Sequence, residues 1–283
     1  MNSISTFTYR QKYFKTTLAE VLKKALVAEK ICTVDNSDIK RIENPYGSQP
    51  TAAVTAINGT YAVSTYTTTD DTLTVDNEVK IAEQIYDFEQ VLTSFDMYAN
   101  RMQEMMYSVA ERIDRFVINN LCEDATGTYT TPTGGFTTAA NINVIISNLA
   151  AKVMGFKDSY KGLFLVIENT DVVGFMQAQM TNGFSYADAA LNNGFMTTYG
   201  GVEIYVVRTG TFADETLGTK TYTNLNHRVF GVKNIATYAS PRGIRYEEKG
   251  VSGKTGQELL VFGYIGFKLW ATKTDLFVDI TLA

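Results

Sequence analysis

Residues 60–126 contain neither glycine nor proline, and this uninterrupted stretch is the strongest constraint in the sequence. Within it, apolar side chains recur in steps of four and three, the spacing that places them on one face of an α-helix. The spacing predicts a helix from Asp87 to Asn120, about 50 Å long at 1.5 Å per residue. The repeating apolar positions are Phe88, Leu92, Phe95, Ala99, Met102, Met106, Val109, Ile113 and Phe116.

Both ends of this predicted helix carry signals. Asp87 and Gln90 are spaced as in a capping box at a helix N-terminus, and Gly127 follows the point where the pattern fades. Such a stripe could form the seam of a coiled coil or the buried side of a spine packed on a sheet. Because few matched charges flank the stripe, we expect the spine on a sheet.

The segment before the helix has a different composition. From Thr51 to about Lys80 it is rich in Thr, Val, Tyr and Ala, which favours β-strands, with turn signals at Asn58-Gly59 and Asp70-Asp71. It contains few large apolar residues, and an isolated hairpin with so little to bury is marginal in water. We therefore expect a β-arm that needs a neighbouring surface, within the chain or on another subunit.

The remaining segments predict a mixed α+β fold rather than a regular βαβ alternation. A short amphipathic helix is expected at 16–30, followed by an irregular stretch with Pro45 and Pro50. The final segment from Glu258 is strand-like and interrupted only by glycines. Further helices are expected at 138–154 and 170–180, and further strands at 163–169, 200–208, 227–240 and 244–248.

Composition limits the class of protein. The formal net charge is −5 and the isoelectric point is about 5.1, which argues against a dedicated nucleic-acid binder with a basic face. Two distant cysteines, Cys32 and Cys122, form no disulfide framework, so a reducing cytosol is the simplest environment. No apolar run approaches 18 residues, and no membrane partner is expected.

No catalytic, cofactor-binding or metal-binding residues are predicted. Gly253-Lys254-Thr255 is similar to the end of a phosphate-binding loop, but Glu248 stands where that motif needs its first glycine. His227 is the only histidine, and no nucleophile motif lies beside it, so a structural or surface role is expected. One histidine and two distant cysteines cannot make a standard zinc site without carboxylate help.

Other chemistry-bearing groups have plainer interpretations. Adjacent acids usually form a solvated face or a turn, although sequence alone leaves a two-carboxylate hydrolase open. A cluster of methionines in the predicted helix is expected to fill core space. The acid pairs are Asp70-Asp71, Glu123-Asp124 and Glu247-Glu248, and the methionines are Met97, Met102, Met105 and Met106.

Four parts of the sequence stand out by their order along the chain. They are LTVDNEVKIAEQIYDFEQVLTSFD (73–96), ANRMQEMMYSVAERIDRFVINNL (99–121) with its A-x-x-ID centre, FLVIENTDVVGFMQA followed by NNGFMTTYGGVEIYVV (192–207), and the closing strands VFGVKNIATYASPRGIRYEE and VFGYIGFKLWATKTDLFVDI. In this order they resemble the major capsid proteins of tailed bacteriophages, which have the Hong Kong ninety-seven fold. The similarity covers nearly the whole chain from about residue 45 and lies in the order of parts rather than in one motif. One departure is the absence of proline near Thr272–Thr274, where most members of the family have one.

The resemblance implies a domain organisation. The long helix would be the spine of a peripheral domain, and the β-arm an extended loop that lies across an adjacent subunit. An N-terminal scaffolding segment of about a hundred residues is not evident, so a separate scaffold or none is expected. The implied parts are an N-terminal arm with a short helix (1–44), an extended β-hairpin loop (45–82), a peripheral domain (83–134), an axial domain (135–225) and closing strands shared by both domains (226–283).

The resemblance also implies a function. It suggests a structural, non-enzymatic coat protein that assembles into pentamers and hexamers, forming an icosahedral or elongated shell around packaged double-stranded DNA. The virion would be its location, with assembly in the bacterial host cytoplasm. Implied partners are further copies of the chain, scaffold, portal and decoration proteins, and DNA contacted without sequence reading. Alternatives are an encapsulin-like nanocompartment shell, a tail or tube subunit, and a hydrolase.

Overall fold

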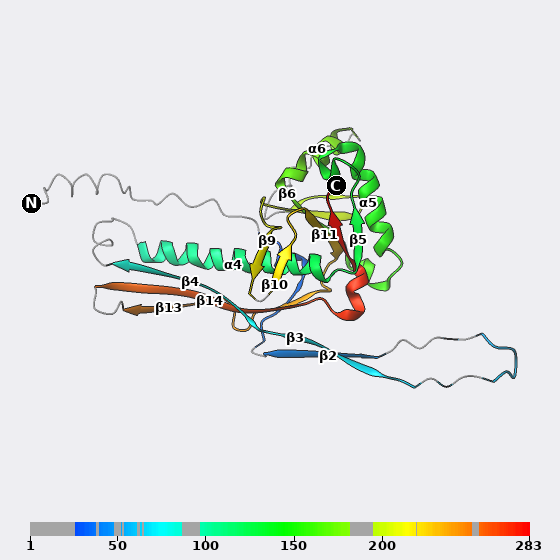
Figure 1. Ribbon diagram of the computed structural model, residues 1–283, viewed down its shortest axis with the longest axis horizontal. Helices are drawn as coiled ribbons and strands as arrows, with labels where there is room; N and C mark the ends of the chain where they lie inside the picture. The colour runs from blue at the N-terminus through cyan, green and yellow to red at the C-terminus, as the bar shows by residue number, and fades with distance from the viewer. Residues whose placement is uncertain are drawn as a thin grey trace, which may run out of the picture.

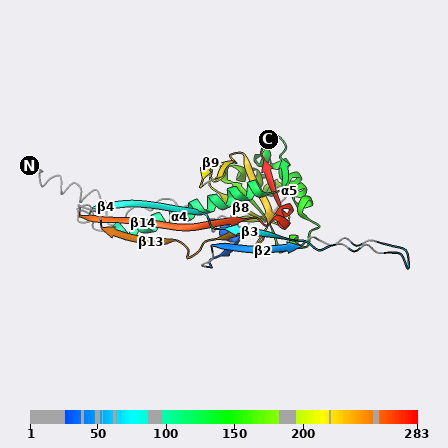
Figure 2. The same ribbon diagram turned by 60° about the horizontal axis from the view of Figure 1, so that its bottom comes forward.

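The computed structural model describes residues 26–37, 40–47, 52, 54–60, 63, 65–86, 97–181, 195–218, 220–250 and 255–283. Figures 1 and 2 show a compact lobe from which two long parts project in opposite directions. One is the elongated part, made of helix α4 (Met97–Asp124) and strands β4 (Asn77–Tyr86), β13 (Arg245–Gly250) and β14 (Gly256–Lys268). The other is the arm, residues 41–74, with β2 (Arg41–Gly47) and β3 (Thr68–Thr74) at its base.

A six-stranded mixed sheet forms the centre of the compact lobe. Its order is β5-β15-β11-β6-β8-β7, with β5 parallel to β15 and β6 parallel to β8. Every residue of β6 is buried, which explains its continuous apolar sequence LFLVIE. The strands are β5 (Gly127–Thr130), β6 (Leu163–Glu168), β7 (Phe195–Tyr199), β8 (Val202–Val207), β11 (His227–Val232) and β15 (Phe277–Thr281).

Helices and short elements complete the lobe. Helices α5 (Ala139–Val153) and α6 (Val172–Thr181) pack on each other, and the β9–β10 hairpin stands beside α4 (Figure 1). The hairpin strands are β9 (Asp214–Leu217) and β10 (Lys220–Thr223), and the 3-10 turns are η1 (Gly135–Thr137), η2 (Lys157–Lys161), η3 (Asn169–Asp171) and η4 (Ala271–Leu276).

The second sheet runs through the elongated part. Its path is β1-β12-β14-β13, with β4 also antiparallel to β14 over ten residue pairs from Gly256↔Tyr86 to Ile265↔Asn77. β14 therefore spans both the sheet beneath α4 and the junction with the lobe. The short elements at this junction are α2 (Ala28–Ile31), β1 (Thr33–Asp35) and β12 (Thr237–Ala239).

Helix α4 is the predicted spine. Its 28 residues span about 42 Å at 1.5 Å per residue. The predicted stripe is buried at Val109, Ile113 and Phe116, and these side chains belong to one continuous core with β14 residues such as Val261. The expectation of a spine on a sheet, rather than a coiled coil, is confirmed.

The predicted element boundaries need several corrections. The long helix ends at Asp124, four residues beyond the predicted Asn120, and the predicted start at 87–96 lies outside the described residues, as does most of the predicted 16–30 helix. The strand expected at 227–240 is two strands, β11 and β12. The closing segment is interrupted not at its glycines, which lie inside β14, but by η4, where the chain passes from one sheet to the other.

Asp70-Asp71 was expected to be a turn but lies within β3, paired with Pro45 and Asn44. The physical reason is long-range, because the Asp71 carboxylate is held by groups about two hundred positions later in the chain. The turn at Asn58-Gly59 is confirmed, with Asn58 at φ 67°, a backbone region that asparagine tolerates better than most residues.

Candidate functional site

The described residues of the arm form an antiparallel ribbon at its base and a turn at Asn58. The ladder of the ribbon runs from Arg41↔Thr74 to Gly47↔Thr68. A ribbon of two strands is barely stable alone, and exposed apolar groups at its tip favour contact with another surface. Four of its large apolar side chains are more than two thirds exposed: Val54, Ile57, Val63 and Tyr66.

The root of the arm is fastened by Asp71. Its carboxylate accepts a hydrogen bond from the backbone N–H of Ala271 at 2.6 Å and lies 2.8 Å from Lys268 Nζ. Burial alone raises the pKa of Asp71, but the bonds from Ala271 and Lys268 outweigh it, so the pKa is below its usual value. Leu73, two positions on, is fully buried. Asp71 and Leu73 therefore fix the direction in which the arm leaves the rest of the subunit.

Close backbone packing supports the same root. A Cβ added to Gly266 would lie 2.4 Å from the carbonyl oxygen of Thr74. Only glycine allows β14 and the end of β3 to approach so closely. The arm base thus crosses β14 in direct backbone contact.

A second anchor holds the start of the described chain against α4. Asp114 Oδ1 accepts hydrogen bonds from the backbone N–H groups of Val27 at 2.9 Å and Ala28 at 2.5 Å. Burial raises the pKa of Asp114 to about 6, although the two N–H donors lower it, and the nearby carboxylates of Glu29 and Glu111 raise it further. This aspartate is the last residue of the A-x-x-ID centre, so the motif has a structural role.

Ion pairs tie α4 to the β9–β10 hairpin. Glu215 accepts from Arg112 Nη1 at 2.9 Å and lies 2.5 Å from Arg115 Nη2. On the other strand, Lys220 Nζ lies 3.0 Å from Asp124 Oδ1. These contacts connect α4 to the hairpin of the compact lobe.

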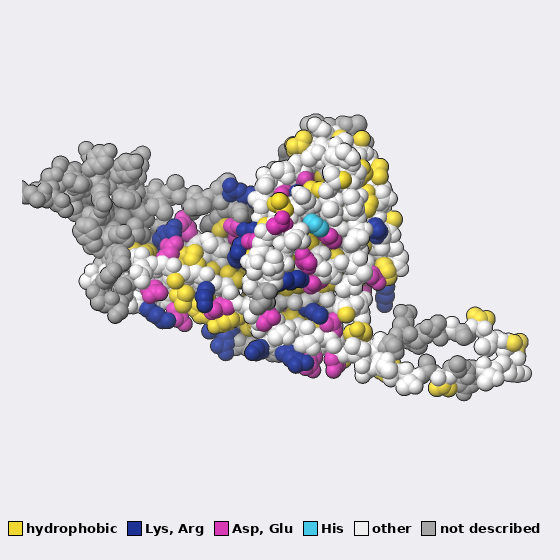
Figure 3. Space-filling model, viewed as in Figure 1, with side chains coloured by type: hydrophobic (Ala, Val, Ile, Leu, Met, Phe, Trp, Pro, Cys, Tyr) yellow, Lys and Arg dark blue, Asp and Glu magenta, His cyan; other side chains and the backbone are white. Residues whose placement is uncertain are grey.

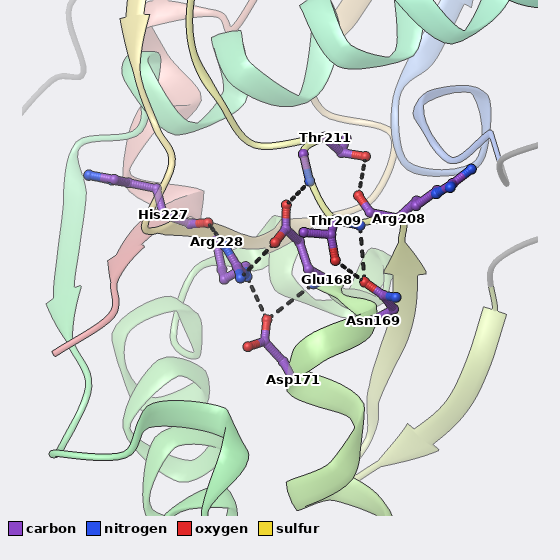
Figure 4. A network of polar contacts seen from close by, with 9 residues as sticks. Glu168, Asn169, Asp171, Arg208, Thr209, Thr211, His227 and Arg228 are labelled. Atoms are coloured by element: carbon purple, nitrogen blue, oxygen red, sulfur yellow. Dashed lines mark hydrogen bonds and ion pairs between the residues drawn. The ribbon is translucent and has the colours of Figure 1, made fainter.

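A buried charge network lies inside the lobe (Figure 4). Arg228, with a side chain 3% exposed, donates from Nε to Asp171 at 2.6 Å and from Nη2 to Glu168 at 3.2 Å. Glu168 also accepts from the backbone N–H of Gly210 at 2.9 Å. Each charge has an opposite partner, which is the condition for burying ions at tolerable cost. The network fastens β6, η3 and β11 together.

His227 was expected to be structural, and its contacts support that interpretation. Its Nδ1 lies 2.8 Å from both carboxylate oxygens of Asp279 on the neighbouring strand. Burial raises the pKa of Asp279, while the hydrogen bond and charge of His227 lower it. The Cys122 thiol is buried and its pKa is well above the usual value, so it is not the thiolate that a Cys-His-Asp site would need.

Two of the other residues singled out in the sequence, Gly253 and Lys254, fall outside the described residues. Glu247 and Glu248 lie in β13, whose six residues are all exposed. Met105 is buried as expected for a core methionine, whereas Met106 is 37% exposed.

Cys32 and Cys122 are both free and buried. Across the described ranges, no group of three or more His, Cys, Asp or Glu side chains could hold a metal ion. In that same part of the chain, no helix is both long and apolar enough to cross a lipid bilayer.

No protein-family model matches the sequence, and no curated protein matches it. Solved structures give a different result. A chain of Mycobacterium phage Che8 is similar with a TM-score of 0.75 at 14% identity, covering 94% of this chain and 95% of that one. The capsid structure of Cyanophage P-SCSP1u gives 0.74 at 13% identity, covering 95% and 92%. The mature capsid of bacteriophage PhiM1 gives 0.70 at 13% identity, covering 95% and 91%.

The chain has the tailed-phage major capsid protein fold. Near-complete coverage on both sides means that the lobe, the elongated part and the arm together make up this capsid fold. The fold expected from the sequence is confirmed, including its mixed α+β class. The arm root at Asp71 and the anchor at Asp114 were not predicted as functional, and the only sequence signals for them were an acid pair and the A-x-x-ID motif.

Proposed function

We propose that the chain is a structural major capsid protein that assembles into pentamers and hexamers of a closed shell around double-stranded DNA. The observation that carries the proposal is the arm. Its root is anchored by Asp71, yet four of its large apolar side chains are exposed within the subunit, in a fold also found in phage capsids. A second copy would supply the surface that the arm lacks.

The parts of the subunit would have distinct roles in the shell. Residues 1–44 would form an N-terminal arm between neighbours, and residues 45–82 the extended loop. Residues 83–134 would form the peripheral domain, 135–225 the axial domain at the five- and six-fold centres, and 226–283 the shared closing strands. The contacts would be heterologous, since the arm and its receiving surface are different parts of the chain, and such contacts close into rings.

The work of this protein would be mechanical rather than catalytic. Within the described residues, Arg228 pairs with two buried carboxylates, and ion pairs join the spine to the hairpin of the lobe. DNA would be contacted without sequence reading, as suits an acidic chain. Scaffold, portal and decoration proteins would be further partners, and the shell would assemble in the bacterial host cytoplasm.

Expression followed by light scattering and negative-stain electron microscopy tests this function. Closed particles tens of nanometres across are expected. A shortened arm, with residues 49–66 replaced by a short glycine linker, keeps Asp71 and Leu73 and should give folded subunits that do not form shells. A monodisperse subunit that never assembles, under any condition or with any co-expressed scaffold, would contradict the proposal. Open cylinders would instead indicate a tube protein.

A further inference from the structure

A hollow of about 240 Å³ lies where α2, β12 and the spine helix α4 meet. A cavity of about 150 Å³ is enough to hold benzene in an engineered protein, so this space can take a small organic molecule. Its polar wall includes Asp114 of α4 and Ser240, which directly follows β12. We call it the junction hollow, and its apolar wall is formed by Leu26, Ala110, Ile113 and Ile244.

Two buried polar side chains on this wall have hydrogen-bonding atoms without a partner. Oδ1 of Asp114 accepts the N–H groups of Val27 and Ala28, but no described residue donates to Oδ2. The Ser240 hydroxyl likewise makes no hydrogen bond to any residue that the structure describes. Both residues are only 5% exposed. Because buried polar atoms nearly always have a partner, these two point to a ligand in the hollow.

The junction hollow carries negative charge without a cation on its wall. Of the described residues that line it, Asp114 and Glu29 are acidic and none is basic. Burial raises the pKa of Asp114 more than its two N–H donors lower it, and Glu29 and Glu111 raise it further. Lys30 attracts the Asp114 carboxylate but does not line the hollow. On the face of the elongated part that Figure 3 shows, by contrast, acidic side chains lie among Lys and Arg.

The wall suits an organic cation better than a metal ion. Calcium and magnesium ions take about six or more oxygen ligands, whereas much of this wall is apolar. A primary ammonium group carries three N–H donors at the end of a carbon chain. It can therefore donate to both open acceptors while its chain lies on the apolar wall. A chain of about five carbon atoms is compatible with the volume.

We infer that the junction hollow binds a small primary alkylamine in its protonated form. The ammonium group donates to Asp114 Oδ2 and to the Ser240 hydroxyl, and the alkyl chain lies against Ala110, Ile113 and Ile244. Such a site goes beyond the proposed shell function and does not depend on it. Because Asp114 also holds the backbone at Val27 and Ala28, a bound amine would strengthen the joint between that segment and α4.

Isothermal titration calorimetry with 1-pentylamine hydrochloride tests the site, on the full-length protein in the assembly state in which it purifies. Saturable binding with one site per subunit is expected at pH 7.5. 1-Pentanol supplies the chain without the charge, and ammonium chloride supplies the charge without the chain. Each should bind about tenfold more weakly or worse, since it satisfies only part of the wall. The absence of saturable pentylamine binding, or equal binding of either control compound, would overturn the inference.

Three variants assign the binding to the hollow. Asp114→Asn removes the charge, and Ala110→Met fills the space while leaving the carboxylate in place; each should weaken pentylamine binding about tenfold or more. Glu123→Gln is the matched control, because it removes an exposed acid from the same helix and should bind like the parent. Parent-like binding by both Asp114→Asn and Ala110→Met, or an equal loss in Glu123→Gln, would refute the site.

The dependence on pH and the position of protection give independent readouts. With a pKa of about 6, Asp114 is mostly protonated at pH 5, so binding should be about tenfold weaker there than at pH 7.5. Tyr238 and Cys32 stay protonated throughout, because burial raises the pKa of both. Hydrogen-exchange mass spectrometry should show amine-dependent protection in the peptides that contain Val27 and Ser240. Protection confined to other peptides would place the amine elsewhere and contradict the inference.

Discussion

Replacing Asp114 by asparagine tests how well its buried charge is compensated. The residue is 5% exposed and its pKa is about 6, against about 3.9 in an unfolded chain. A carboxyl whose pKa is raised by folding binds more protons in the folded state between these values. The free energy of unfolding should therefore fall as pH rises from about 4 to about 6 and should not fall further above that range.

The size of this effect follows from the pKa difference. About two pKa units at about 1.4 kcal/mol each set an upper limit of about 3 kcal/mol. Asparagine keeps a carbonyl oxygen that can accept from Val27 and Ala28 but carries no charge to desolvate. At pH 7.5 Asp114→Asn should be more stable than the parent by about 1–3 kcal/mol, and at pH 4 the two should be equal within about 0.5 kcal/mol.

Urea unfolding followed by circular dichroism at pH 4, 5, 6 and 7.5 measures this difference. Unassembled subunits are required, because assembly adds stability by mass action. Glu123→Gln removes an exposed charge from the same helix and should change stability by less than about 0.5 kcal/mol. Asp114→Ala removes the acceptor and should lose about 2 kcal/mol. An Asp114→Asn protein less stable than the parent at pH 7.5, with an unchanged slope between pH 4 and 6, would refute the reasoning.

Three further predictions concern other joints. Asp71→Ala leaves a backbone N–H and a lysine without their acceptor and should lower the free energy of unfolding by about 2 kcal/mol. Because the pKa of Asp71 is lowered, its contribution should be present at neutral pH and fade below about pH 4, as urea titrations of parent and variant would reveal. Arg228→Met leaves two buried carboxylates unpaired and should cost about 3–5 kcal/mol, seen as a lower urea midpoint; an unchanged midpoint would contradict the network. Burial raises the pKa of both the Cys32 and the Cys122 thiol, so Ellman's reagent should find no reactive thiol at pH 8 until denaturant is added, and prompt labelling of native protein would be evidence against burial.

The helices and strands that could be predicted from the sequence are those marked by an apolar pattern among neighbouring residues. Helix α4 was predictable because its apolar side chains recur over many turns, and α5 was predictable within one residue at each end. β6 was evident from its unbroken apolar run. These patterns lie within a few consecutive turns or positions of the chain, so one sequence displays them directly.

Elements fixed by distant contacts were not predictable in the same way. The β9–β10 hairpin is short and has only two large core side chains, Leu217 and Tyr222, and its position also depends on Glu215 and Lys220 meeting charges on α4 about a hundred positions earlier. Asp71 looked like a turn residue because its partners, Lys268 and Ala271, are remote in sequence. The Arg228 network likewise joins groups about sixty positions apart. Only the fold brings such charges together.

The opposite projection of arm and sheet gives a row of subunits a direction. Each copy would offer one arm and one receiving surface, so every ring of copies would have a sense of rotation. A copy inserted in the reverse orientation would lose the contact on each side. A subunit with a shortened arm would still accept its neighbour while offering nothing to the next, so small amounts of it should stop growth at one end only.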